Sequence, residues 1–150
     1  MTDFSKIAEI EIVYRTQIKP VDRPRITCSK EAYQVLSSIW NVDTIELRED
    51  FKVILLNRNS RVLGVIHLSQ GGMSGTVVDV RHIFASAIKA NASAIMLAHN
   101  HPSGNLEPSI QDENMTKRCA EIGRLMEIPV YDHIIITSSG FYSFADNGRM

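Results

Sequence analysis

The pattern of apolar and polar positions divides the chain into short alternating stretches and longer helical ones. Residues 6–18 alternate imperfectly, with Ile10, Ile12 and Tyr14 on one side, and predict a strand that leads into a proline-marked connector. Residues 94–98 form a wholly apolar run, which is typical of a central strand buried on both faces. The remaining predicted strands are residues 50–57 and 61–68, joined as a hairpin by a turn at 57–60, and residues 130–137 and 141–144.

Three other segments have the spacing of amphipathic helices. Ser29 suits the N-cap of a helix that reaches residue 40, and Asp79 suits the N-cap of a second helix with apolar positions 83, 84, 87 and 88. A third helix is predicted over residues 110–126, and Pro129 ends it. Helices interleaved with strands predict an α/β (α+β) domain in which helices flank a mixed β-sheet.

Composition indicates a single globular domain. A chain of 150 residues with 44% hydrophobic and 22% charged residues has the balance of a soluble domain. No apolar run approaches the roughly 20 residues that span a bilayer, and the N-terminus lacks the apolar segment of a signal peptide. Cys28 and Cys119 are far apart and lack metal-binding spacing. We therefore expect a cytoplasmic protein with reduced thiols and no membrane contact.

Charge gives little support for a nucleic-acid partner. The formal net charge is −1 and the pI is about 6.5, whereas proteins that bind phosphates usually carry a basic excess. One local basic cluster is most simply a solvated surface, and a weak acidic partner there is the alternative. The cluster consists of Arg15, Lys19, Arg23, Arg25 and Lys30.

The candidate chemistry lies in the polar stretch from residue 99 to residue 112. His99 and His101 are two positions apart at the end of a predicted strand, so their side chains point to the same side. Asp112 falls in the first turn of the next predicted helix and can bring a carboxylate to the same point. Two imidazole nitrogens and one carboxylate leave a fourth position for water, which is the layout of a catalytic zinc ion. The sequence therefore predicts one Zn²⁺ per chain.

A hydrolytic zinc site also needs a group that accepts a proton and returns it. Glu49 is the first choice, because it lies at the start of a predicted core strand and shares strand parity with residues 51, 53 and 55. Glu46 is the nearest alternative. Ser109 offers a hydroxyl that can donate to an oxyanion beside the metal.

Ser109 and Asp112 also have a purely structural explanation. Ser109 fits the N-cap of the third helix, and Asp112 fits the matching acidic residue of its first turn. This explanation covers both residues and leaves His99 and His101 without one.

The other histidines show no partner at ligand spacing, and we interpret His67, His82 and His133 as ordinary strand or helix residues. Asp132 and His133 fit either an outer pair behind the metal or, more simply, a buried histidine with its hydrogen bonds satisfied. The glycines at 71, 72 and 75 indicate a loop that either lines a substrate groove or forms a turn.

The spacing H-x-H-x7-S-x2-D with an upstream glutamate resembles the signature of the JAMM, or MPN+, metalloproteases. Within that group, the residues around the motif are similar to those of the RadC family. The matching stretches are residues 90–104, 108–112 and 132–137, and the resemblance extends from about Ile26 to the end of the chain. It implies a JAMM/MPN sandwich, related to the cytidine-deaminase fold, with zinc at one edge of a mixed sheet. It divides the chain into an N-terminal strand and connector, residues 1–25, and a RadC-like domain, residues 26–150.

At the level of residues, the resemblance implies that His99, His101 and Asp112 are the zinc ligands, that Ser109 is the serine on the oxyanion side and that Glu49 is the general acid and base. It implies a zinc-dependent peptidase or isopeptidase, whose substrates include ubiquitin-like tails, sulfur-carrier fusions and small amides. The alternative is a DNA-repair-associated accessory protein. Full-length RadC proteins carry an N-terminal helix-hairpin-helix region that binds DNA, whereas about 25 residues precede the resemblance here. The sequence sets neither the substrate nor the oligomeric state.

Overall fold

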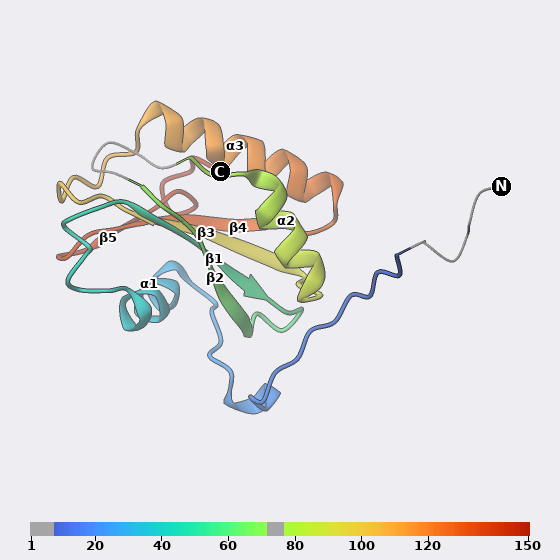
Figure 1. Cartoon of the computed structure of the whole chain (residues 1–150). Helices are drawn as coiled ribbons and strands as arrows, with labels where there is room; N and C mark the ends of the chain where they lie inside the picture. The colour runs from blue at the N-terminus through green and yellow to red at the C-terminus, as the bar shows by residue number, and fades with distance from the viewer. Residues whose placement is uncertain (1–7, 72–76) are drawn as a thin grey trace.

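The computed structural model describes residues 8–71 and 77–150, which form one mixed β-sheet with helices on both faces (Figure 1). A 3₁₀ turn in the connector, η2, precedes the elements of the sheet. In chain order the elements are η2 (Pro20–Asp22), α1 (Ser29–Ile39), β1 (Asp50–Leu56), β2 (Val62–Gln70), α2 (Val80–Lys89), β3 (Ala94–Asn100), α3 (Ile110–Leu125), β4 (Val130–Ile136) and β5 (Phe141–Ser143). The predicted α+β class is confirmed.

The five strands lie in the order β2-β1-β3-β4-β5. The hairpin of β1 and β2 is antiparallel, as predicted, and β1 also pairs antiparallel with β3. β3 and β4 are parallel and are connected through α3, which gives one contiguous β3–α3–β4 unit. β5 returns antiparallel to β4. The predicted run at 94–98 is therefore the central strand.

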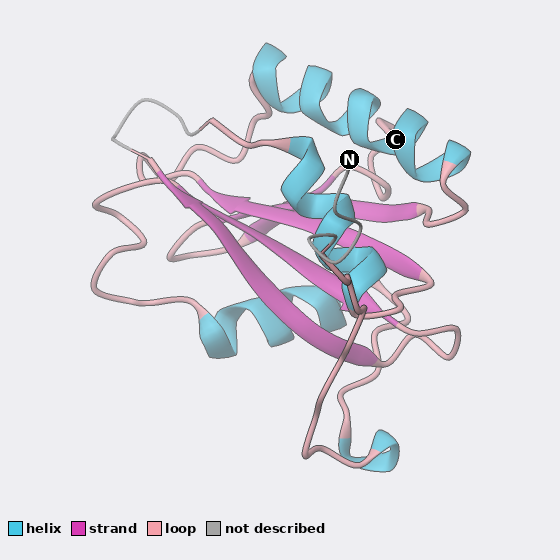
Figure 2. Cartoon of the chain, turned by 45° about the vertical axis from the view of Figure 1, so that its right-hand side comes forward, coloured by secondary structure: helices cyan, strands magenta, loops and turns pink. Residues whose placement is uncertain are grey.

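Two apolar cores lie on opposite faces of the sheet, with α2 and α3 over one face and α1 over the other (Figure 2). Side chains of alternate residues in the central strands point into the two cores. Phe51, Val53 and Leu55 of β1 face α2 and α3, whereas Ile54 and Leu56 face α1. In β3 the residues that face α2 and α3 are Ile95 and Leu97, and those that face α1 are Ala94, Met96 and Ala98. This alternation decides on which face each polar residue at the end of β3 appears.

The strand predicted over residues 6–18 is wrong for the part that the structure describes, residues 8–18. This segment is extended but pairs with no strand among the described residues, and its large apolar side chains are exposed. The alternation is therefore present in the sequence, but the chain offers it no neighbouring strand here. The first seven residues, and the glycines at 72 and 75, lie outside the described residues.

The first helix begins one residue earlier than predicted, at Ser29 itself. The N-cap position is Cys28, which makes no side-chain capping bond, and Ser29 is the first helical residue. The carboxylate of Glu31 instead accepts hydrogen bonds from the backbone and hydroxyl of Thr27. The cap predicted for α2 is confirmed, because the Asp79 side chain accepts from the Arg81 amide. None of the helices in the described part of the chain is long and apolar enough to cross a membrane.

Candidate metal centre

Three side chains from the end of β3 and the start of α3 converge on one point. The Nε2 atoms of His99 and His101 are 3.0 Å apart. The Asp112 carboxylate lies 3.1 Å from His99 Nε2 through Oδ1 and 3.3 Å from His101 Nε2 through Oδ2. Tetrahedral zinc with bonds of about 2.0–2.2 Å separates its ligand atoms by roughly 3.3–3.6 Å. The observed separations are within a few tenths of an ångström of that geometry, so these residues fit a metal ion.

A buried chain of hydrogen bonds fixes which nitrogen of His99 faces the cluster. The Thr116 hydroxyl donates its one proton to the Asp112 carbonyl (2.7 Å), so Thr116 Oγ1 accepts from Nδ1–H of His133 (2.6 Å). His133 is fully buried, and burial lowers its pKa well below the ordinary value, so the ring is neutral. Its Nε2 therefore accepts from His99 Nδ1–H (2.8 Å). His99 Nε2 is left with a lone pair aimed at the cluster.

The same donor counting applies to His101. Its Nδ1 lies 2.6 Å from the backbone carbonyl of Asn105, an acceptor only, so Nδ1 carries a proton and Nε2 presents a lone pair. With Asp112 ionised, three lone-pair atoms then face one another at about 3 Å. Such an arrangement is stable only with a cation among them, either a proton or a metal ion.

Asp112 is at once a member of this cluster and part of a helix cap. Ser109 Oγ accepts from the Asp112 amide (3.1 Å), and Asp112 Oδ2 accepts from the Ser109 amide (2.7 Å), which is a complete capping box. The structural explanation of these two residues is therefore confirmed, but it does not compete with the metal explanation. The capping box holds the carboxylate at the position where it meets both imidazoles.

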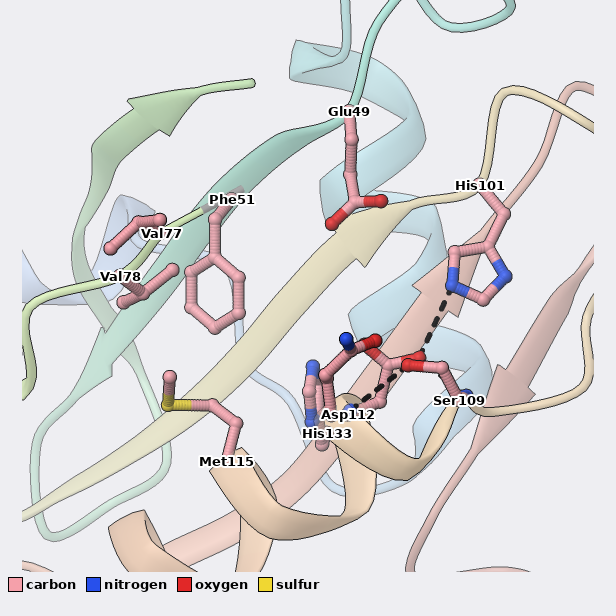
Figure 3. A pocket seen from close by; sticks show the side chains of 10 residues that line it. Glu49, Phe51, Val77, Val78, His101, Ser109, Asp112, Met115 and His133 are labelled. Atoms are coloured by element: carbon pink, nitrogen blue, oxygen red, sulfur yellow. Dashed lines mark hydrogen bonds and ion pairs between the residues drawn. The ribbon is translucent and has the colours of Figure 1, made fainter. Parts of the chain in front are cut away.

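The cluster lines a pocket of about 460 Å³ that also contains Glu49 (Figure 3). Glu49 immediately precedes β1, and its side chain points from the strand end into the pocket, toward the side where His101 and Asp112 lie. Burial raises the pKa of the Glu49 carboxyl, and the neighbouring Asp112 charge adds to this effect, whereas the two histidines oppose it. Phe51, Val78 and Met115 form an apolar wall opposite these polar groups.

Asn100, between the two histidines in sequence, faces the other side of the sheet and fixes the segment that carries Glu49. Its Oδ1 accepts from the Asp50 amide (2.7 Å). Its Nδ2 donates to the carbonyls of Ile45 (2.7 Å) and Arg48 (2.9 Å). Both hydrogens of the side-chain amide and its oxygen are thus engaged, and the residue is fully buried. One strand end thus positions both the histidines and the glutamate.

The structure separates Glu46 from this site. Its Oε1 accepts from the Ser138 hydroxyl at 2.6 Å, and it lines a different pocket with Tyr33 and Trp40. Glu46 is thus a natural control for Glu49.

Sequence reasoning missed the roles of His133, Thr116 and Asn100. His133 is indeed a satisfied buried histidine, enclosed by Phe51 and Phe144, but its partner is His99. The Asp132 carboxylate bonds elsewhere, to the His133 backbone amide and to the Ser143 hydroxyl. The useful signal was strand parity. In the parallel pair, His133 lies across from Leu97 and on the same face as His99.

Fold and site define a JAB-type domain: residues 26–149 match the RadC-like JAB domain family, and the chain belongs to that family. It is 37% identical over 146 residues to a UPF0758 protein of Flavobacterium johnsoniae, a match that covers 96% of this chain and 62% of the relative. It is 42% identical over 129 residues to a UPF0758 protein of Porphyromonas gingivalis, covering 85% of this chain and 56% of that one. The chain thus spans little more than half the length of these relatives.

Proposed function

We propose that this chain is a zinc-dependent hydrolase that cleaves an amide bond in a peptide or isopeptide substrate. The observation that carries the proposal is the convergence of His99, His101 and Asp112 in the pocket into which Glu49 points. Zinc, when bound there, supplies Lewis-acid chemistry: it polarises a carbonyl and lowers the pKa of a bound water to about 7.

Glu49 is suited to move the proton. A carboxylate that is half-buried, with its pKa raised by burial, is a better base near neutral pH than an exposed one. In this role Glu49 accepts a proton from the attacking water and delivers it to the departing amine. Its position is fixed through the hydrogen bonds of Asn100 to the adjoining backbone.

Ser109 is suited to stabilise the oxyanion. In the capping box its Oγ acts as acceptor from the Asp112 amide, so the hydroxyl proton is not used there. Ser109 lines the pocket beside Asp112, and its O–H can donate to a carbonyl oxygen that gains negative charge. The apolar wall of Phe51, Val78 and Met115 favours a substrate with an apolar side chain near the scissile bond.

The test combines metal analysis with a cleavage screen on peptide and isopeptide libraries, including ubiquitin-like tails. We expect about one zinc per chain and cleavage by the wild type. Glu49→Gln should retain zinc and lose activity on the order of 100-fold to 10,000-fold, because the amide keeps the size of the side chain but accepts no proton.

Glu46→Gln is the matched control and should remain active, since Glu46 lies in another pocket. A chain prepared without chelator that holds no metal would contradict the proposal, as would a fully active Glu49→Gln variant.

A further inference from the structure

β2 is an outermost strand of the sheet, and its middle, residues 64–68, is open on the outer side within the described part of the chain. Its nine residues, Val62–Gln70, contain no proline, lysine, arginine or carboxylate. Native proteins usually block such edges with charges, prolines or a covering segment, because an open edge pairs with other strands. Among the described residues its start is covered, because the Pro24 carbonyl accepts from the Val62 amide and the Tyr14 hydroxyl donates to the Leu63 carbonyl. Within the described ranges, no strand pairs with the outer side of residues 64–68.

The same chain carries an extended segment that pairs with no strand among the residues that the structure describes. Residues 8–18, here called the arm, run away from the domain as an extended chain (Figure 1, dark blue). Ile10 is 90% exposed and Ile12 is 66% exposed. These β-branched residues alternate with Glu9, Glu11 and Val13, the pattern of a strand with one apolar face. Strand-forming residues left in solvent indicate that the arm has a partner in another molecule.

We propose that two copies of this chain exchange their arms, each arm adding as a strand to the β2 edge of the other copy. One open edge and one unpaired arm per chain are complementary, and a two-fold exchange satisfies both in both copies. Strand addition of this kind uses backbone hydrogen bonds for affinity and the alternating side chains for register. The inference does not depend on the proposed hydrolase activity.

The connector directs the arm away from its own edge. Arg61 holds the turn before α1 by donating to the carbonyls of Val21 (3.2 Å) and Arg23 (2.7 Å). Arg23 in turn donates to the carbonyl of Ile18 (3.3 Å). The arm therefore reaches its own β2 through the Tyr14 hydroxyl, and residues 8–13 run away from the sheet. A second copy is the partner whose edge the arm is free to follow.

The exchange also places each side chain in a suitable environment. Ile10, Ile12 and Tyr14 would lie beside the apolar residues of β2 that pack toward α2, namely Leu63, Ile66 and Leu68. Glu9, Glu11 and Arg15 would lie on the opposite face. The arm then becomes the new outermost strand. Its charged side chains protect the new edge from further pairing, whereas β2 has no such charges.

The first test measures the mass of the 150-residue chain by light scattering over a range of concentrations. We expect twice the 16.8 kDa mass of one chain for the wild type. Ile10→Asp combined with Ile12→Asp should give a monomer with unchanged far-UV spectrum and zinc content, because both residues are exposed. Leu125→Asp, at a residue of α3 that is 75% exposed, is the control and should remain dimeric. A monomeric wild type, or a double variant that stays dimeric, overturns the inference.

The second test asks whose edge the arm covers. In a Cys28→Ser background, one tagged chain carries Glu11→Cys, on the face of the arm opposite Ile10 and Ile12, and an untagged chain carries His67→Cys, at an exposed position of β2 on the face opposite Ile66 and Leu68. Cys119 is buried and should not react. After mixing, a short bismaleimide should join tagged to untagged chains. A single chain with both cysteines that forms only an internal cross-link, even when concentrated, shows that the arm folds onto its own edge and overturns the exchange.

Discussion

Helices α2 and α3 begin with similar capping chemistry but in different surroundings. Asp79 caps α2 through the Arg81 amide and pairs with the Arg81 guanidinium at 2.7 Å, at the surface. At the start of α3, Ser109 and Asp112 form a capping box, and the Asp112 carboxylate also meets two imidazoles. A capping acid thus becomes part of a candidate metal centre when a neighbouring strand, here β3, places two imidazole nitrogens beside it.

The two acids also differ in what holds their charge. Hydrogen bonds from Arg81 lower the pKa of Asp79 to about 2. Burial would raise the pKa of Asp112, but hydrogen bonds from His101 and His99 lower it well below the usual range. Asp79 is stabilised by a neighbour on its own helix, whereas Asp112 depends on β3. Substitutions at these acids and their neighbours can separate a cap held by its own helix from one that depends on a neighbouring strand.

The largest effect is expected from Asp112→Asn. Its amide oxygen can still accept from the Ser109 amide, so the cap is kept while the anionic ligand is lost. We expect zinc affinity to fall by more than about 100-fold, beyond the effect of an outer-shell change. Competition with a chromophoric chelator measures the affinity. Asp79→Asn is the control with unchanged zinc binding. Equal zinc affinity in the two variants would show that Asp112 is not a metal ligand.

A smaller loss is expected from Thr116→Val, which leaves His133 Nδ1–H without its acceptor. The histidine can then change tautomer, and His99 loses the contact that orients its Nε2. Outer-shell changes of this kind cost about 10-fold to 100-fold in metal affinity. Thr137→Val, at a buried threonine just after β4 whose hydroxyl donates to the Gly140 carbonyl and not to His133, should bind zinc as the wild type does. Wild-type affinity in Thr116→Val would show that the hydrogen-bond chain is incidental.

Asn100→Asp should affect the segment before β1 more than the metal. The substitution places a carboxylate oxygen against the carbonyls of Ile45 and Arg48, where the wild type donates two hydrogen bonds. A buried group left unpaired costs about 1–3 kcal/mol. We expect faster amide hydrogen exchange at residues 45–50 and lower activity, with zinc affinity within about 10-fold of the wild type. Unchanged hydrogen exchange at residues 45–50 would show that the Asn100 side chain does not hold this segment in place.

The smallest effect is expected from removing the metal with a chelator. Without the cation, nothing joins the Asp112 carboxylate to the lone pairs of His99 and His101, and it keeps only the hydrogen bond from the Ser109 amide. The first turn of α3 should therefore exchange its amides a few-fold faster. The first turn of α2, capped by Asp79 alone, should not change. Hydrogen-exchange mass spectrometry on the same sample compares the two helices directly. Equal changes at both helix starts would indicate a global loss of stability.

Local patterns in the sequence predicted most of the fold, and each wrong prediction has a physical reason. The apolar run of β3 and the cap of α2 carry their own information, so both predictions are confirmed. The alternation of residues 8–18 predicts a strand, but a strand also needs an edge, which no local pattern specifies. For α1, the preference of serine for N-caps misplaced the helix start by one residue, because Glu31 reaches back to Thr27.

The residues of the candidate site also differ in whether a local sequence pattern could predict their role. The spacing of His99, His101 and Asp112 is a short-range pattern, and the structure brings these three residues together. The contribution of His133 depends on β3 and β4 being parallel neighbours, and that of Asn100 depends on a contact across 50 residues of sequence. Composition and spacing contain no signal for such contacts. Strand parity would have found the face of each residue but not its partner.

The contiguous β3–α3–β4 unit has a consequence for how the molecule folds. The three candidate ligands, Thr116 and His133 all lie within it, whereas Glu49 comes from a distant part of the chain. Contacts between residues close in sequence form early, because little loop entropy must be lost. The metal centre can therefore assemble before β1 docks and brings Glu49. The proposed zinc site then has a kinetic consequence: zinc added during refolding should accelerate formation of this half of the sheet.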